Sequence, residues 1–300
     1  MIDAILLFDK PPGITSQQAV TKVKRLFQAK KAGHTGTLDP FATGLLPICL
    51  GQATKYADFF LQADKHYLAT VQLGTCSTTG DTEGEFTTCL DYVAPTEQAV
   101  CDVLMSLLGK QQQYPPRYAA IKYQGKPLYY YARKGIKVTL TPREVTINEL
   151  QLVKYQDTTL SLAIHCSKGT YVRSIVEQIG LKLGCGAYTQ SLRRLGVGEL
   201  AGLPMWDLSS LQAIVDREGV TGLRATIISI DDGLSNFPAV TLDQDNLQAI
   251  QQGKMLNMPQ MDSAGVVRLH DQQQVFWGLG QSDGQMLRAL RLMAVTKHSS

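Results

Sequence analysis

The chain has 300 residues, of which 44% are hydrophobic and 18% charged, and its net charge at pH 7 is +3. This length predicts about two domains, and this composition excludes a disordered chain. No apolar run approaches the ~18 residues that a membrane-spanning helix needs, and the first residues lack the basic and apolar regions of a signal peptide. We therefore expect a cytoplasmic protein with no membrane partner.

Strands and helices alternate along the first 200 residues without the regular spacing of βαβ units. Apolar runs predict buried strands at 4–8 and 45–50, and between them Ser16 is expected to cap a helix that buries Val20, Val23 and Phe27. Period-two alternation predicts half-buried strands at 67–73 and 160–166. A further helix is expected from Tyr171 to Leu183. This mixture favours an α+β sheet domain.

A second, smaller module is predicted at the C-terminal end. Residues 231–238 are rich in turn-forming residues and are the candidate linker. One helix is expected at 243–252, followed by short strands near Val266, Val275 and Met286. About 60 residues of this kind suit a small β-barrel.

Charge is distributed unevenly along the chain. Between Lys110 and Glu149, eight basic residues stand against two acids and are interleaved with six tyrosines, whereas Cys76 to Asp102 holds six acids and no Lys or Arg. Basic and aromatic side chains together offer phosphate contacts and stacking faces for RNA. Charge alone fits a solvated surface loop equally well.

Several classes of site are disfavoured by spacing. The six cysteines and five histidines form no CxxC, HxxxH or HExxH pattern, so free thiols in a reducing compartment are expected rather than zinc or a disulfide framework. No P-loop, GxGxxG or GxSxG motif occurs. The acidic stretch at 81–85 lacks the ligand order of a calcium loop. We expect neither a metal nor a cofactor.

The most unusual stretch runs from Gly33 to Gly44, where three glycines surround one carboxylate, that of Asp39. Glycine is favoured where the backbone turns sharply or approaches a ligand closely, and Pro40 biases Asp39 towards an extended backbone. A carboxylate held on such a loop is well placed to act on a substrate. Capping of a turn is the structural alternative.

This stretch, Gly-His-Thr-Gly-Thr-Leu-Asp-Pro-Phe-Ala-Thr-Gly, resembles the catalytic motif of the TruB family, the tRNA pseudouridine-55 synthases. Thr37 and Phe41 stand where the family commonly carries Ala and Leu. Four further segments resemble the family in order, within residues 10–16, 65–81, 115–133 and 167–194. The last 60 residues or so resemble it only loosely.

The resemblance implies an α+β fold with a pseudouridine-synthase-type mixed β-sheet and flanking helices. It places the catalytic domain at 1–232. Within this domain, the basic segment 111–137 resembles the family's RNA-clasping insertion, which we expect to be mobile without RNA and to become ordered on binding. Residues 238–300 are then expected to form a PUA-like RNA-binding β-barrel domain.

The reaction that the resemblance implies is isomerisation of uridine 55 in the T loop of tRNA to pseudouridine, with flipping of the base and without a cofactor. Asp39 is expected to be the nucleophile, attacking the ribose C1′ or the uracil C6, or to assist loss of the 2′ proton; all three routes stay open. We expect this carboxylate to be ionised at neutral pH. Arg173 is expected to lower its pKa and orient it.

The resemblance also assigns supporting roles. Tyr67 is expected to stack on the flipped uracil and share in proton transfer, Leu192 to form the apolar wall of its pocket, and His34 to fill the space that the base leaves. Further contacts with the substrate are expected from Tyr171, Asp81, Lys10 and Lys65. The RNA backbone is expected to meet Lys122, Arg133, Arg193 and Arg194.

Two alternatives remain open at this point. One is a relative that modifies ribosomal RNA with a guide RNA, and the other is a non-catalytic tRNA-binding folding chaperone. The first interpretation predicts a tRNA T stem-loop as partner, no obligate protein partner and a monomer.

Overall fold

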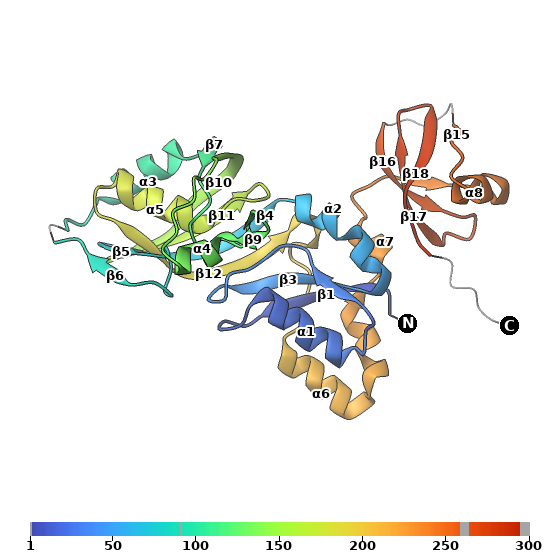
Figure 1. The fold of residues 1–300 in the computed structure, drawn as a ribbon, viewed down its shortest axis with the longest axis horizontal. Helices are drawn as coiled ribbons and strands as arrows, with labels where there is room; N and C mark the ends of the chain where they lie inside the picture. Colours follow the sequence, from blue (N-terminus) through green and yellow to red (C-terminus); the bar gives the residue numbers. More distant parts are fainter. Residues whose placement is uncertain (1, 91, 259–263, 295–300) are drawn as a thin grey trace.

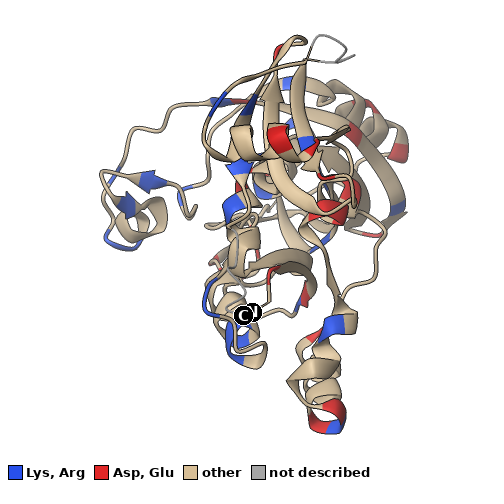
Figure 2. Ribbon diagram, turned by 90° about the vertical axis from the view of Figure 1, so that its right-hand side faces the viewer, with Lys and Arg blue, Asp and Glu red and all other residues tan. Residues whose placement is uncertain are grey.

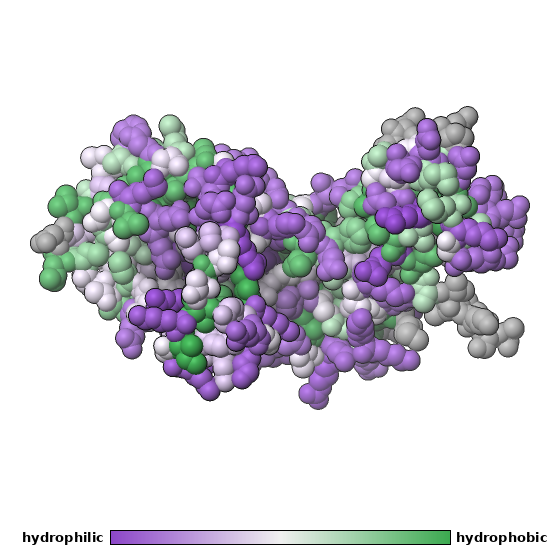
Figure 3. All heavy atoms as spheres, turned by 45° about the horizontal axis from the view of Figure 1, so that its top comes forward, coloured by the Kyte–Doolittle hydropathy of each residue, from purple (hydrophilic) through white to green (hydrophobic). Residues whose placement is uncertain are grey.

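The computed structural model describes residues 2–90, 92–258 and 264–294. Most of the chain builds one large β-sheet with its helices, and the C-terminal residues form a smaller sheet beside it (Figure 1). Figure 3 shows hydrophilic and apolar residues interspersed over both bodies, with a notch between them. This arrangement agrees with the α+β class expected from the sequence.

The large sheet has strand order β13-β1-β3-β12-β4-β11-β10-β7, and β2 pairs with β3. Its strands are antiparallel neighbours except for β3 and β12, which run parallel. The strand bounds are β1 (Ala4–Lys10), β2 (Ala32–His34), β3 (Thr43–Leu50), β4 (Lys65–Leu73), β7 (Gly109–Gln113), β10 (Arg143–Gln156), β11 (Thr159–Cys166), β12 (Ala187–Val197) and β13 (Ile227–Ile228). The strands predicted from apolar runs and alternation are all present.

Helices cover both faces of this sheet. Leu6 and Phe8 of β1 pack into a core with α1, α3, α5 and α6, whereas Ile5 and Leu7 face a second core with α2 and α7. The helix bounds are α1 (Ser16–Leu26), α2 (Ala57–Gln62), α3 (Glu97–Ser106), α5 (Val172–Lys182), α6 (Leu208–Glu218) and α7 (Ile230–Gly233), with 3₁₀ turns at Gly51–Tyr56, Gly198–Leu200 and Val220–Thr226. Among the described residues, no helix is long and apolar enough to span a membrane.

The cap of α1 differs from the prediction. Thr15, not Ser16, is the N-cap, because its hydroxyl accepts from the Gln18 N–H while the Gln18 side chain accepts from the Thr15 N–H. Ser16 is therefore the first helical residue. It is buried and bonds to Leu38 instead.

The C-terminal sheet has the order β14-β16-β17-β18-β15. Its elements are β14 (Ala239–Thr241), α8 (Gln244–Gln251), β15 (Leu256–Asn257), β16 (Gly265–His270), β17 (Phe276–Ser282) and β18 (Met286–Leu292). The predicted helix and three strands are confirmed. Over the described part of this module the sheet has β14 and β15 at its edges and forms a half-barrel, in agreement with the small β-barrel module that the sequence predicts. Residues 259–263 and 295–300 of the predicted 238–300 domain lie outside the described residues.

The predicted linker at 231–238 is more ordered than its turn-forming residues indicate. Its first residues belong to α7, which Ser229 caps, and Gly233 packs against Ile5 of β1. The Asp231 carboxylate also receives Arg268 Nη1 at 2.8 Å and His270 Nε2 at 2.8 Å, both from β16. The segment therefore contacts β1 of the large sheet and β16 of the smaller sheet.

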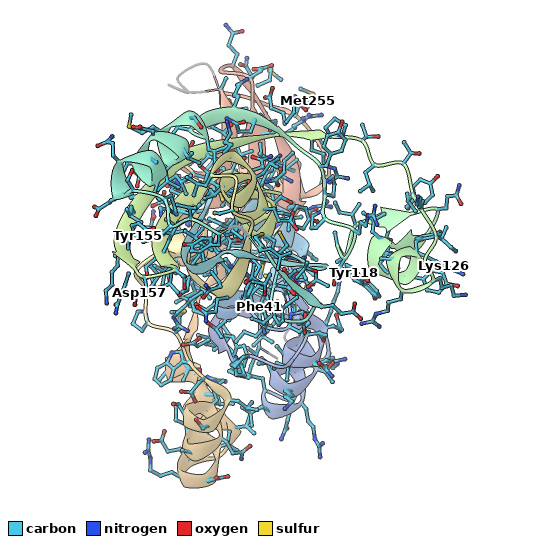
Figure 4. All side chains as sticks on the ribbon, turned by 90° about the vertical axis from the view of Figure 1, so that its left-hand side faces the viewer. Phe41, Tyr118, Lys126, Tyr155, Asp157 and Met255 are labelled. Atoms are coloured by element: carbon cyan, nitrogen blue, oxygen red, sulfur yellow. The ribbon has the colours of Figure 1, made fainter. Side chains whose placement is uncertain are left out.

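The basic, tyrosine-rich segment leaves the large sheet after Gln113. It carries the short strands β8 (Lys122–Tyr123) and β9 (Lys126–Pro127), then α4 (Leu128–Arg133), before β10 begins at Arg143. Figures 2 and 4, drawn from opposite sides, show it standing away from the body, with Lys126 at its outer part. Residues 111–113 of the predicted insertion belong to β7 because they pair with β10. We call residues 114–142 the basic arm.

A close backbone approach at Gly44 yields a test of the fold. Gly44 has φ +95°, and a Cβ there would lie 2.2 Å from the Arg194 carbonyl oxygen on the parallel strand β12. Gly44→Ala should therefore lower the free energy of unfolding by about 1–3 kcal/mol from backbone strain and by a similar amount from the clash. Gly135→Ala is the matched control, because Gly135 has φ +68° but nothing lies within 4 Å of its Cβ position. If urea unfolding showed the same loss of unfolding free energy in both variants, this account would be contradicted.

Candidate active site

The loop that carries Asp39 is fastened on both sides of this residue. Ser16 Oγ donates to the Leu38 carbonyl at 2.9 Å and accepts from the Leu38 N–H at 2.8 Å. Lys10 Nζ donates to the Pro40 carbonyl at 3.1 Å. A side chain from α1 and one from β1 thus set the backbone position of Asp39.

Arg173 lies beside Asp39, the position that the resemblance to the family implies for it. It occupies the first turn of α5, is 2% exposed, and its Nε lies 2.9 Å from Asp39 Oδ2. The Nε–H is not aligned with that oxygen, so this contact is an ion pair rather than a directed hydrogen bond. Nη1 contacts Asp81 Oδ2 and the Thr79 carbonyl, each at 3.0 Å. The guanidinium therefore bridges two carboxylates.

Asp81 is buried and turned towards Arg173. It lies in the segment 78–85, which joins the paired strands β5 (Thr75–Ser77) and β6 (Phe86–Thr88). Its Oδ1 accepts from Thr79 Oγ1 at 2.5 Å and from the Glu83 N–H at 2.9 Å. These bonds fix the Asp81 carboxylate against Arg173.

The pKa of Asp39 departs from the sequence-based expectation. Burial raises it above the ordinary aspartate value; Arg173 opposes this rise, and the negative charge of Asp81 adds to it. The sequence-based expectation of a lowered pKa considered only the positive charge of Arg173. It did not consider that the Asp39 side chain is only 28% exposed, and this loss of solvent disfavours the charged form. Asp39 is therefore a more basic carboxylate than an exposed one, with Arg173 favouring its ionised form.

Asp39 and Arg173 sit where two cavities adjoin. The smaller cavity, of about 530 Å³, and the larger, of about 950 Å³, share both of these residues. The smaller one mixes apolar, aromatic and basic lining residues, among them Leu61, Lys65, Tyr67, Tyr171, Leu192 and Arg194. The larger one reaches His34, Asp81 and Arg133. A planar group entering the smaller cavity would meet the Asp39 carboxylate, which lines it.

Tyr67 and Leu192 come from the neighbouring antiparallel strands β4 and β12. Both side chains line the smaller cavity, at 9% and 7% exposure. Burial raises the pKa of Tyr67, against the opposing effect of Arg194. The phenol therefore stays protonated at neutral pH. The cavity thus offers one aromatic face with a hydroxyl and one aliphatic wall.

The two adjacent arginines of β12 differ in their positions. Arg194 is 1% exposed, and it donates from Nε to the Leu45 carbonyl at 2.7 Å and from Nη2 to the Gly36 carbonyl at 3.1 Å. A surface contact with an RNA backbone, as predicted for Arg194, does not fit this interior position. Alternation along β12 explains the difference, since Arg193 faces the other way and pairs with Asp9 at 2.6 Å.

Both predicted substrate-binding lysines bond to backbone carbonyls. Lys10 is fully buried, and its Nζ donates to Pro11 and Ile14 as well as to the Asp39 loop. Lys65 Nζ donates to the carbonyls of Leu61 and Ala63 while its side chain lines the smaller cavity. Burial lowers the pKa of each to about 8. Lys10 therefore supports the loop rather than facing a substrate, because all three of its protons already have acceptors.

His34 and Tyr171 line different cavities. His34, at the end of β2, lines the larger one, and its Nδ1 accepts from the Gly36 N–H at 3.3 Å, so a neutral ring carries its proton on Nε2. Burial, helped by Arg194, lowers its pKa and favours this neutral form. Tyr171 precedes α5 and lines the smaller cavity, and burial raises its pKa to about 12.

Of the residues predicted to meet the RNA backbone, Lys122 and Arg133 lie exposed on the basic arm. The Arg133 guanidinium stands over the Tyr129 ring at 5.6 Å, and Lys126 stands over Tyr130 at 4.4 Å. These pairs present cations and aromatic faces together on the arm.

The sequence analysis did not predict two residues whose hydrogen bonds support the site, Ser16 and Gln113. Ser16 was interpreted as a helix cap, although it belongs to one of the segments that resemble the family. Gln113 is buried against the start of α5, whereas its neighbour Gln112 is exposed. Nothing in a run of three glutamines distinguishes one from the next.

The described residues contain no group of three or more His, Cys, Asp or Glu side chains that could hold a metal ion. All six cysteines are free thiols, as predicted.

The direction of the Asp39 pKa shift is measurable. Followed through its ¹³C carboxyl signal, the pKa of Asp39 should lie above the ordinary value of about 3.9, because burial outweighs Arg173. Arg173→Met should raise it further, since the opposing positive charge is lost. Asp207, the exposed N-cap of α6, is an internal reference, because hydrogen bonds from Ser209 and Ser210 lower its pKa. A pKa of Asp39 below that of Asp207 would refute this assignment.

Comparison with known proteins adds independent observations. Residues 24–172 match the model of the TruB family pseudouridylate synthase N-terminal domain, residues 173–235 that of the tRNA pseudouridylate synthase B C-terminal domain, and residues 238–293 that of the pseudouridine synthase II TruB C-terminal region.

Full-length relatives agree with these matches. Proteins named tRNA pseudouridine synthase B from a Marinomonas species (strain MWYL1) and from Haemophilus influenzae (strain PittEE) are 43% and 42% identical, and the alignments cover 99% and 97% of this chain and 97% and 95% of theirs. A solved H/ACA RNP bound to a substrate RNA containing 2′-deoxyuridine shares the fold, with a TM-score of 0.75 at 21% identity over 98% of this chain and 86% of that one. With near-complete coverage at this identity, the chain belongs to the TruB family of pseudouridylate synthases.

Proposed function

We propose that this protein isomerises uridine 55 in the T loop of tRNA to pseudouridine, with Asp39 as the nucleophile. The observation that carries the proposal is the Asp39–Arg173 ion pair in the lining of a cavity that Tyr67 and Leu192 also line. It is supported by relatives above 40% identity that are named tRNA pseudouridine synthase B. The site and these names point to one reaction.

The cavity accounts for handling of the base. A uridine within a folded loop has to leave its stack before chemistry is possible, and the smaller cavity offers a tyrosine face and a leucine wall for the extruded uracil. His34, neutral and next to the larger cavity, is the proposed occupant of the space that the base leaves. Tyr171 lines the cavity proposed for the uracil. Asp81 orients Arg173 through the Nη1 group, which does not contact Asp39.

The proposed reaction needs no oxidant or reductant. The bond from N1 to C1′ breaks, the base rotates, a bond from C5 to C1′ forms, the C5 proton is released and N1 gains a proton. Attack of Asp39 on C1′, its attack on C6 and its assistance in 2′ proton loss all require an ionised carboxylate. Arg173 supplies the opposing charge that keeps this buried group ionised.

Buried cations around the loop act as positioning residues in this proposal. Lys10 and Arg194 donate to carbonyls on either side of Asp39, and Lys65 ties down the chain before β4. A carboxylate held by such contacts has less freedom to lose when the substrate arrives. Arg194 thus serves the pocket rather than the RNA backbone.

Lys122 and Arg133 on the basic arm, with its tyrosines, are the proposed RNA contacts, and Arg193 next to Asp9 is a third. The arm is proposed to become ordered on tRNA, and the C-terminal half-barrel to act as a PUA-like RNA-binding module. We also propose a monomer that works in the cytoplasm with no obligate protein partner. The similarity to the H/ACA structures lies below 25% identity and supports the fold alone, so it does not favour the guide-RNA alternative.

A tritium-release assay tests the central proposal. Purified protein without cofactor should release tritium from tRNA labelled at uracil C5, and Asp39→Asn should lower the rate by a factor on the order of 10⁴, because an amide cannot replace the carboxylate. Binding of tRNA by the variant should stay within a few-fold of wild type.

Asp216→Asn, an exposed aspartate on α6, is the matched control and should keep full activity. A tRNA with cytidine at position 55 should release nothing. Release that requires an added guide RNA would favour the first alternative. Binding without release would favour the chaperone.

Salt dependence tests the role of the basic arm. Removing one phosphate contact, by Lys122→Ala or Arg133→Ala, should reduce the slope of log K for tRNA against log salt concentration by roughly 1. Lys154→Ala is the control, since Lys154 is exposed on β10 near Tyr155, at the edge opposite Lys126 in Figure 4. An unchanged slope in the two arm variants would exclude these contacts.

A further inference from the structure

The root of the basic arm is joined to the start of α5 by one buried amide. Gln113, the last residue of β7, is 4% exposed. Its Oε1 accepts from the Tyr171 N–H at 2.7 Å, and its Nε2 donates to the Tyr171 carbonyl at 3.0 Å. The side chain thus pairs with Tyr171 as a peptide group of a neighbouring strand would.

Tyr171 is the N-cap residue of α5, and its side chain makes no capping bond. Its carbonyl also accepts the first helical bond, from the Ile175 N–H at 3.3 Å. Arg173 follows two residues later, within the first turn. The amide of Gln113 therefore helps to set where α5 begins, and with it the origin of the Arg173 side chain.

The next residues of the arm contact the same helical turn. Ser174 Oγ donates to the Tyr114 carbonyl and Arg173 Nη2 to the Tyr118 carbonyl, each at 3.4 Å. Tyr118 lies between the body and the outer part of the arm around Lys126 (Figure 4). Gln113 and the first residues of the arm are thus bonded to the start of α5 at three points, of which the Gln113 contact has the shortest hydrogen bonds.

We propose that Gln113 is a positioning residue that couples the basic arm to the Arg173–Asp39 pair. When RNA orders the arm, the Gln113 amide holds the first turn of α5 in the position in which Arg173 meets Asp39. Only a side chain that both donates and accepts can make the two bonds to Tyr171. This inference rests on the proposed function, because it assigns RNA binding to the arm.

Gln113→Met tests the coupling, because methionine keeps length and burial but loses both hydrogen bonds. Single-turnover tritium release should fall on the order of ten- to a hundredfold, as expected for a small misplacement of a reacting group. The Kd for tRNA should change less than threefold. The acid limb of the rate profile should move to higher pH, since a displaced Arg173 opposes the raised pKa of Asp39 less effectively. A merely structural role would leave that limb in place.

Gln112→Met is the matched control, one residue earlier on the same strand but exposed. It should behave as wild type in rate, affinity and pH profile. If Gln113→Met does not fold, Gln113→Glu keeps the shape and removes the donor when ionised, and the same comparison applies. A wild-type rate and acid limb in the folded variant would overturn the proposal.

Hydrogen exchange separates this inference from the proposed reaction, because it needs binding only. On wild type, unlabelled tRNA should slow exchange both in residues 114–137 and in residues 172–176. In Gln113→Met the first region should still be protected and the second should not. Equal protection of 172–176 in both proteins would refute the coupling. An absence of tritium release from wild type would instead refute the reaction.

Discussion

A buried guanidinium imposes the main constraint on this molecule. Arg173 is almost fully enclosed, and a charge in that position is costly unless nearly all of its donors find partners. Its partners come from the Asp39 loop, the turn at Asp81, and the basic arm at Tyr118. These three segments are far apart in the chain, so the fold has to bring all of them to the N-terminal end of α5. The position of Asp39 is a consequence of that convergence.

The other buried cations around the site serve the backbone. Lys10, Lys65 and Arg194 all donate to main-chain carbonyls, and together they hold the loop and strand ends that line the smaller cavity. Burying three cations costs free energy of desolvation, and their hydrogen bonds to carbonyls offset part of that cost. The same bonds restrict the loops to few conformations. A nucleophile on a glycine-rich loop needs such support, because glycine by itself gives the loop freedom.

Much of this organisation was accessible from the sequence. The alternation at 67–73 and 160–166 located strands β4 and β11, since one face of each strand is buried. The motif from Gly33 to Gly44 indicated Asp39, and its resemblance to a family named Arg173 as the neighbour. Local signals also predicted helix α8 and the three longest strands of the C-terminal sheet.

The periodic elements and the residue types that carry chemistry could be predicted because both depend on near neighbours in the chain. The fold was needed to show that Arg194 is internal while Arg193 pairs with Asp9, that Lys10 bonds to carbonyls, and that burial raises the pKa of Asp39. The same holds for Gln113, which ends a run of three glutamines and is the buried one. Burial, pairing and desolvation are set by residues distant in sequence, and no local pattern records them.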